Sequence, residues 1–239
     1  MMLTKRLALL LACACVAGAP GLSQDVPALE PDYAHSGFSA SLWHTDLSGL
    51  NDALTGAGYF RLPGHVMMFG EETTIGFVDG PRVGLIVASG SACSRVGDRI
   101  ARLSLTFGSG LLEWGLTTAA GRSIAFGLTL GGGTSTLTLV DHLPGSFEEA
   151  LKDPFRAKLD RWLYIIEPSA SAQGSPFEWL DLKLRVGYLM TIGCDWKAEE
   201  TAYRYPMSGL GGPLVEVSAA LHLERLVHQA LEEEAGPSE

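Results

Sequence analysis

The feature that most constrains the fold of this sequence is a regular alternation of large apolar residues with small or polar ones between Arg99 and Asp141. Glycine-containing breaks at 108–110, 119–121 and 131–133 divide the stretch into four runs. Within the runs, large apolar residues occupy every second position: Leu103, Leu105, Phe107, Leu112, Trp114, Leu116, Ile124, Phe126, Leu128, Leu130, Leu137 and Leu139. A period of two is typical of β-strands with one apolar face, and short breaks favour antiparallel hairpins.

Similar alternation recurs along the chain, in 36–43, 83–93, 159–167, 182–194 and 215–223. Between the first two, Leu47, Leu50 and Leu54 follow a helical spacing, which predicts one short amphipathic helix within 46–58. The triple glycine at 131–133 reads as a hairpin turn or as a bulge in one long strand. We therefore predict an all-β fold over residues 36–225: an antiparallel up-and-down barrel of about 8–10 strands with one helix after the first strand.

The second face of these strands carries small residues and isolated charges. Charged residues make up only 18% of the 239 residues, whereas a solvated strand face normally carries more of them. Charges of both signs can pair inside a narrow barrel, which predicts an interior network of Arg102, Glu113, Lys183, Arg185, Glu216 and His222, with Arg161 and Glu167 on the same face. The net charge of -10 argues against nucleic acid as a partner.

Two orientations of the apolar face compete. In a soluble barrel it points inward, whereas in a membrane barrel it points at lipid and the small residues fill the interior. The small second face favours the membrane barrel. Against it stand connections that do not alternate between long and short, an acidic C-terminal tail, and aromatic residues at only 8%.

The first residues resemble a secretory signal. Lys5 and Arg6 precede the apolar run 7–17, and small residues follow, so residues 1–22 are predicted to be a signal peptide. Residues 23–35 are predicted to be a flexible lead-in, and residues 226–239 an acidic tail. The protein is therefore expected to be exported to the outer membrane or periplasm.

The four cysteines fall into two pairs. Cys13 follows a sequence similar to a lipoprotein box and could carry a lipid, or it is simply a small residue of the signal. Cys93 and Cys194 lie at the ends of predicted strands. In an oxidising compartment they could form a disulfide, and the alternative is two lone buried cysteines.

Several short motifs carry a family resemblance. They are Leu50-Asn51 with Gly58-Tyr59, the glycines after Leu130, Ile166-Glu167-Pro168, and Trp179 leading into Val186-Gly187-Tyr188. With the Gly-rich strand pairs, they make the sequence similar to a loose group of Gly-rich outer-membrane-type β-barrel proteins. The resemblance implies a signal peptide, a barrel and an envelope location. It brings no catalytic residues, and the acidic tail departs from it.

The sequence offers little chemistry. The six histidines show no metal-ligand spacing, and no cofactor is predicted. His35-Ser36 is reminiscent of the residues of small barrel lipid deacylases, which keeps a lipid-modifying enzyme as an outsider. We expect a non-enzymatic envelope barrel that contacts outer-membrane lipid and presents residues 142–158 and 195–212 to a protein partner. The alternative is a soluble periplasmic barrel that holds a small apolar ligand.

Overall fold

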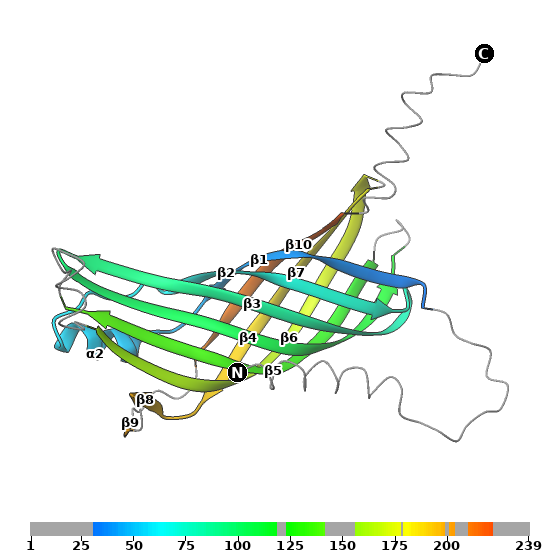
Figure 1. Cartoon of the computed structure of the whole chain (residues 1–239). Helices are drawn as coiled ribbons and strands as arrows, with labels where there is room; N and C mark the ends of the chain where they lie inside the picture. Colours follow the sequence, from blue (N-terminus) through cyan, green and yellow to red (C-terminus); the bar gives the residue numbers. More distant parts are fainter. Residues whose placement is uncertain are drawn as a thin grey trace, which may run out of the picture. The chain divides into compact units, whose positions relative to one another are not determined.

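The computed structural model describes residues 31–118, 123–141, 156–177, 179–198, 201–203 and 210–221. The chain divides into two compact units, 1–30 and 31–239, and every described residue belongs to the second. The predicted signal peptide, Cys13, His142, His222 and the acidic tail lie outside the described residues. The elements are β1 (Tyr33–His44), α2 (Ser48–Gly56), β2 (His65–Gly76), β3 (Gly80–Val96), β4 (Arg99–Thr117), β5 (Ser123–Val140), β6 (Arg156–Phe177), β7 (Leu180–Gly193), β8 (Trp196–Ala198), β9 (Thr201–Tyr203) and β10 (Gly211–Leu221) (Figure 1).

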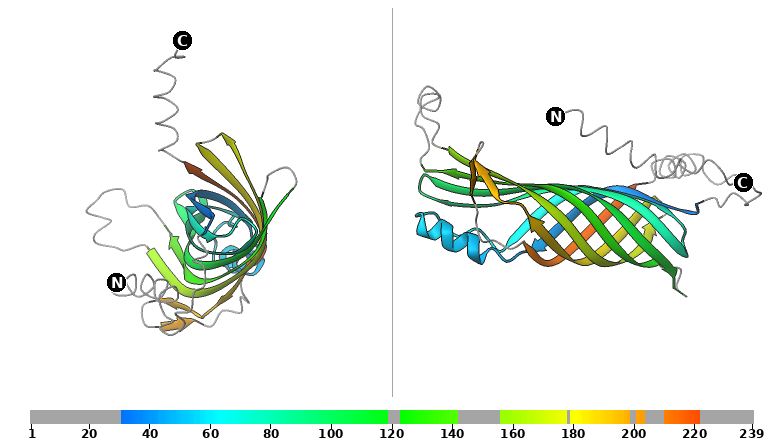
Figure 2. Two further views of the ribbon diagram at one scale, coloured as in Figure 1. Left: turned by 90° about the vertical axis from the view of Figure 1, so that its right-hand side faces the viewer. Right: turned by 90° about the horizontal axis from the view of Figure 1, so that it is seen from below.

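Eight of these strands form a closed antiparallel barrel, which confirms the predicted fold class. Consecutive strands from β1 to β7 pair in chain order, β10 pairs with β7, and β1 pairs with β10 to close the ring (Figure 2). β8 and β9 form a small hairpin outside the ring, joined to β6 through the pair Asp160 and Lys197. β1 begins at Tyr33, so the last three residues of the predicted lead-in are part of the barrel.

The strands are staggered around the ring. Paired residues can be followed once around the barrel from Tyr33 to Trp43, ten positions further along β1, through Gly76, Arg82, Glu113, Gly127, Ser169, Gly187 and Leu214. With a rise of ~3.3 Å per residue and strands ~4.8 Å apart, this stagger tilts the strands by about 40° from the barrel axis. An eight-stranded barrel of this kind has an interior just wide enough for side chains to fill.

The two ends of the barrel differ in their connections. The connections 77–79, 118–122 and 178–179 lie at one end, the short-turn end, where β1 also begins and β10 ends. The strand ends that flank the connections 45–64, 141–155 and 194–210 lie at the other, the long-connection end, together with the tight turn at 97–98, where Gly97 has φ 57°. The three successive connections 77–79, 97–98 and 118–122 are all short, so strict alternation of long and short connections is absent, as predicted, although every long connection follows a strand that ends at the same end of the barrel.

Two of the expected breaks lie inside continuous strands. Residues 108–110 lie within β4 and residues 131–133 within β5, and their pairing with the neighbouring strands is regular. A Cβ atom added at Gly131 would lie 2.4 Å from the carbonyl oxygen of Gly108. Because this pairing is regular, the triple glycine is neither a turn nor a bulge. The missing side chain of Gly131 instead allows β4 and β5 to approach closely.

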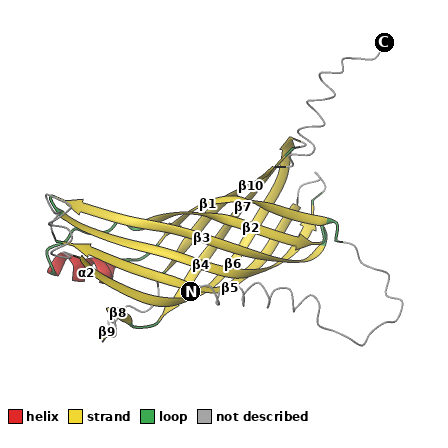
Figure 3. Ribbon diagram, viewed as in Figure 1, coloured by secondary structure: helices red, strands yellow, loops and turns green. Residues whose placement is uncertain are grey.

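The helix α2 follows β1, as predicted, and is the red element in Figure 3. Leu50 and Leu54 form its buried face. The Asn51 side chain accepts a hydrogen bond from the backbone N–H of Leu62 (2.7 Å) and donates one to its carbonyl oxygen (3.1 Å), which holds the connection back to β2. Before the helix, the Ser48 backbone N–H donates to the Asp46 carboxylate and lowers the pKa of Asp46. Among the described residues, no helix is long and apolar enough to cross a membrane.

The apolar face changes sides halfway along β3, β4 and β5. On β4, Leu112 and Trp114 are each 55% exposed on the outside of the barrel, whereas Leu103 and Leu105 are buried inside it. β3 and β5 repeat the pattern, with outward Val83, Leu85, Val87, Leu128 and Leu130 in one half and inward Ala92 and Leu137 in the other. The prediction that Leu103, Leu105, Leu112 and Trp114 share one face is therefore wrong, because the odd and even positions of a continuous strand face opposite sides.

Candidate functional site

The inward-facing residues near the short-turn end form a buried cluster of charged side chains. Six residues make it up, and we call them the charged cluster: Glu72, Glu113, Glu167, Lys183, Arg185 and Glu216. They come from β2, β4, β6, β7 and β10, and each occupies an inward position of its strand. Their side chains are between 0% and 4% exposed.

Lys183 connects opposite sides of the barrel. Its ammonium lies 2.6 Å from Glu72 Oε1 and 2.8 Å from Glu113 Oε1. Lys183 is on β7, whereas the two carboxylates come from β2 and β4, which do not pair with β7. The lysine therefore links strands across the interior rather than along the sheet. Charge-assisted hydrogen bonds of this kind are among the strongest in proteins.

Arg185 holds the other carboxylates. Its Nη2 donates to Glu216 Oε1 at 2.7 Å, and this pair is directly opposed on β7 and β10. Its Nε lies 3.6 Å from Glu167 Oε1, and its Nη1 lies 3.8 Å from Glu72 Oε2. Glu72 thus contacts both cations, so the cluster is one network and not two separate pairs.

Polar groups close the interior below the charged cluster, at the short-turn end. The Arg82 guanidinium lies 3.7 Å from the centroid of the Tyr33 ring and donates to the carbonyl oxygens of Phe77 and Val78. Nearby, His35 Nε2 and Ser218 Oγ share a hydrogen bond of 2.8 Å. With side chains no more than 4% exposed, the charged cluster is placed to brace the strands across the interior.

The structure places the predicted network residues in three ways. Glu113, Lys183, Arg185 and Glu216 are brought together, and Glu167 joins them. His222 lies outside the described residues. Arg102 is exposed on the outer face of β4, because the odd positions of that strand face inward, so its assignment to the interior is wrong. Glu72 was missed, although Glu71-Glu72 in an alternating strand implies that one of the two carboxylates points inward.

The remaining site predictions also need correction. Cys93 and Cys194 are free and exposed, so they are neither bonded nor buried; they lie on β3 and just after β7, which are not neighbours. His35 points into the barrel, whereas Ser36 faces outward and lies 3.1 Å from the Thr73 hydroxyl. Adjacent residues of a strand face opposite sides, so this His-Ser pair cannot act on one substrate.

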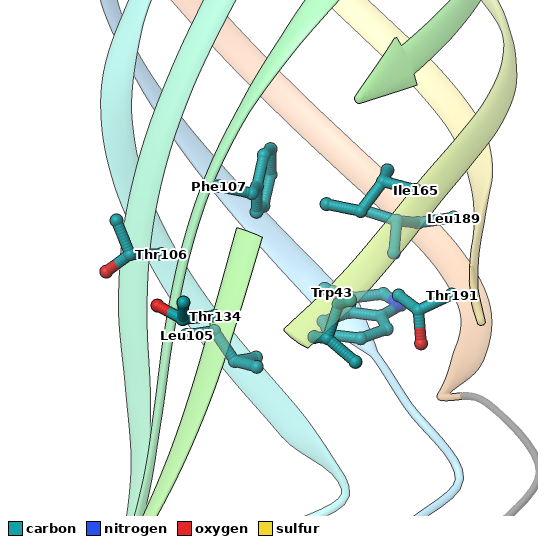
Figure 4. Close-up of a pocket in the computed structure, with 9 residues that line it drawn as sticks. Trp43, Leu105, Thr106, Phe107, Thr134, Ile165, Leu189 and Thr191 are labelled. Carbon is teal, nitrogen blue, oxygen red and sulfur yellow. The ribbon is translucent and has the colours of Figure 1, made fainter. Parts of the chain in front are cut away.

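Apolar side chains fill the other half of the interior. Trp43, Met68, Leu103, Leu163 and Leu189 belong to a core cluster that also contains Leu47, Leu50 and Leu54 of the helical segment. A small cavity of about 10 Å³ lies there. Its lining residues include Trp43, Phe107 and Ile165, which are labelled in Figure 4. A cavity of this size holds at most a single water molecule.

The outer surface carries a continuous apolar belt. Large apolar side chains with substantial exposure come from every strand of the ring; examples are Phe38, Phe69, Leu85, Trp114, Phe126, Tyr164, Leu184, Val186, Tyr188 and Val217. Towards the long-connection end, the outward residues of β3, β4 and β5 become polar, with Ser89, Ser91, Thr106, Thr134 and Thr138. On β3, β4 and β5 the belt therefore covers only the half of the barrel that holds the charged cluster, whereas on β2, β6 and β7 it continues beside the apolar core with Met67, Trp162 and Ile192.

No known family model matches the chain, and no curated protein sequence matches it either. Among the described residues, no group of three or more histidine, cysteine or acidic side chains is arranged to hold a metal ion. The function must therefore be argued from the barrel itself.

Proposed function

We propose that this protein is an integral β-barrel of the bacterial outer-membrane type, with a structural or interaction role rather than a catalytic one. The observation that carries the proposal is the inversion along β3, β4 and β5: on these strands the outer face is apolar where the interior holds charged and polar side chains, and polar where the interior is apolar. A barrel in water throughout has no reason to invert, whereas a barrel half immersed in lipid must do so.

The apolar belt around the outside of the barrel supports this proposal. Soluble monomers rarely expose contiguous apolar patches larger than a few hundred Å². Here Leu184, Val186 and Tyr188 are 48%, 49% and 51% exposed in succession on β7, and comparable residues continue around the ring. Closure of the barrel also satisfies the backbone hydrogen bonds of the strands, which a lipid environment requires.

The filled interior argues for anchoring and display rather than transport. The charged cluster fills one half of the interior and the apolar core fills the other, so the described strands enclose no open channel. The long connections and α2 gather at one end. We propose that this end meets a partner, and the connections 142–158 and 195–212 remain the candidates for that contact.

The two other candidate functions have less support. A carrier of an apolar ligand needs an internal cavity of several hundred Å³, against the small cavity of Figure 4. A groove of about 440 Å³ has Val83, Trp114 and Phe126 among its lining residues. The side chains of these three residues face outward, where a lipid tail would lie. A lipid-modifying enzyme built on His35 and Ser36 is disfavoured by their opposite directions.

Two tryptophans of the chain offer a direct test. Trp114 lies in the belt and is 55% exposed, whereas Trp43 is 1% exposed inside the barrel. Single-tryptophan variants that retain one or the other are folded into vesicles of phosphatidylcholine brominated on its acyl chains. Because bromine quenches indole fluorescence only at short range, we expect strong quenching of Trp114 and weak quenching of Trp43.

The controls separate folding from insertion. Both variants should keep a heat-modifiable mobility on gels and should need detergent for extraction from cell envelopes. Equal, weak quenching of both tryptophans, together with release of the folded protein by a detergent-free periplasmic wash, would contradict membrane insertion and favour the soluble barrel.

A further inference from the structure

One charged side chain of the interior stands apart from the charged cluster. Arg161 is an inward residue of β6 towards the long-connection end, and only 4% of it is exposed. Its Nε and Nη2 atoms have no hydrogen-bond partner. No described carboxylate pairs with it: its neighbour Asp160 lies 3.0 Å from the Lys158 ammonium and also accepts from the Thr136 hydroxyl. A buried cation without a partner is costly, so this arrangement calls for an anion.

One edge of the Arg161 guanidinium is buried without a hydrogen-bond partner. The Trp196 ring lies against the guanidinium, with 4.5 Å between the guanidinium carbon and the ring centroid, and occupies its face. Gly193 gives it room, since a Cβ atom there would lie 3.2 Å from Nη1. Ser135 is directly opposite Arg161 on β5, is fully buried, and its hydroxyl also has no partner.

These unused donors form a recognisable set. The N–H groups of Nε and Nη2 point in parallel along one edge of the guanidinium, which is the fork that binds two oxygens of one anion. The Ser135 hydroxyl adds a third donor from the neighbouring strand. Both oxygens of a carboxylate bound to this fork lie in the guanidinium plane, whereas a tetrahedral phosphoryl group carries a further oxygen outside that plane that can accept from a third donor.

We propose that Arg161 and Ser135 form a binding site for a phosphoryl group at the long-connection end of the barrel. The site does not depend on membrane insertion, because it is built from interior residues of β5 and β6 and from Trp196. The same phosphoryl chemistry is offered by free phosphate and by a phospholipid head group.

The test uses the full chain folded in detergent micelles and inorganic phosphate as the probe. Binding to the protein should broaden the ³¹P resonance of phosphate. Phosphate should also raise the midpoint of thermal unfolding of the protein, compared with chloride at the same ionic strength. Arg161→Gln should weaken binding roughly tenfold or more, and Ser135→Ala should weaken it less. Arg102→Gln, which removes an exposed arginine from the same end of the barrel, should bind like the parent.

Stability without phosphate gives an independent readout. Because Arg161→Gln removes an unpaired buried charge, this variant should unfold at the same temperature as the parent or a higher one. If it unfolds at a clearly lower temperature, the guanidinium already has a partner within the chain, and the proposal fails. Ser135→Ala changes volume little and keeps the test valid if Arg161→Gln does not fold.

A second arm separates the two sources of the phosphoryl group. Binding of both inorganic phosphate and dihexanoyl phosphatidic acid, with loss of both in Arg161→Gln, supports a site open to free phosphate. Binding of the lipid alone, lost in the same variant, supports a head-group site. Equal stabilisation by acetate, or phosphate binding unchanged in Arg161→Gln and Ser135→Ala, would overturn the proposal.

Discussion

The two halves of the barrel interior fill the same space in opposite ways. At the short-turn end, Lys183 and Arg185 hold four glutamates, while apolar residues cover the outside. At the long-connection end, Trp43, Leu103 and Leu163 fill the inside, while serines and threonines lie on the outside of β3 to β5. The contrast teaches that the surroundings of a strand, rather than its place in the fold, decide which face is apolar.

The largest effect is expected from breaking the charged cluster. Lys183→Met leaves Glu113 buried without a cation and leaves Glu72 with only its longer contact to Arg185, so it should lower the free energy of unfolding by about 3–5 kcal/mol. Urea unfolding in micelles, followed by tryptophan fluorescence, measures the loss. Adding Glu113→Gln to this variant should restore part of it. If Lys183→Met costs no more than Arg102→Gln, the cluster does not brace the barrel.

In the apolar half, the corresponding change is a truncation. Leu103 is fully buried, and Leu103→Ala should cost about 3 kcal/mol through lost burial and the cavity left behind. Leu103→Met keeps the volume and should cost under about 1.5 kcal/mol. The same unfolding measurement applies to both. Equal, small losses would mean that this half is loosely packed and that the comparison between the halves fails there.

The boundary of the apolar belt can be located with arginine. Leu112 and Thr106 are both outward residues of β4, one inside the belt and one beyond it. In lipid vesicles, Leu112→Arg should cost about 2–4 kcal/mol, whereas Thr106→Arg should cost ~1 kcal/mol or less. Unfolding by urea from the vesicles gives both values. Equal costs would place both positions in the same environment and contradict the boundary.

The triple glycine lies near the junction of the two halves. Gly131→Ala would force a Cβ atom against the backbone of β4, so it should cost about 1–3 kcal/mol. Gly110→Ala is the matched control, because the nearest atom to its added Cβ is 3.9 Å away. Comparison of the two thermal unfolding midpoints measures the difference. Equal tolerance would show that β4 and β5 can separate at this point.

A smaller effect of opposite sign is expected at Glu71. Its carboxylate faces outward in the belt, with Phe38 and Val87 paired to it on either side. Glu71→Leu should raise the free energy of unfolding in vesicles by about 1 kcal/mol, because lipid-facing acids are moderately unfavourable. Glu71→Gln should give part of this gain. A loss of stability in both variants would show that the carboxylate has a favourable partner on the outer surface.

Much of the fold follows from sequence alternation, because a barrel of this size needs little beyond strands of period two and short turns. The faces were harder to assign. In the sequence, Gly108 and Gly110 indicate a break between two strands, although β4 is continuous there. This hides the fact that the large apolar residues occupy odd positions before the glycines and even positions after them. Arg102, at an even position before the glycines, is therefore predicted to point inward, whereas it faces outward.

The charged cluster could be predicted in part for the same reason. Lys183 and Arg185 lie two positions apart on β7, and Glu216 lies on β10. The apolar face of each of these strands stays on the outside along its whole length, so alternation in the sequence shows that the three charged side chains point inward. Glu72 has a second glutamate beside it, and alternation alone does not say which of the two points inward. The distances that link Lys183 to Glu72 across the barrel depend on the stagger of the strands, which no local pattern encodes.

The pairing of β1 with β10 has a consequence for biosynthesis. Phe38 on β1 pairs with Ala219 on β10, so the barrel cannot close until β10 has left the ribosome. Every shorter nascent chain has two unpaired borders that invite association with other chains. Removing β10 should therefore give aggregates rather than a smaller folded product.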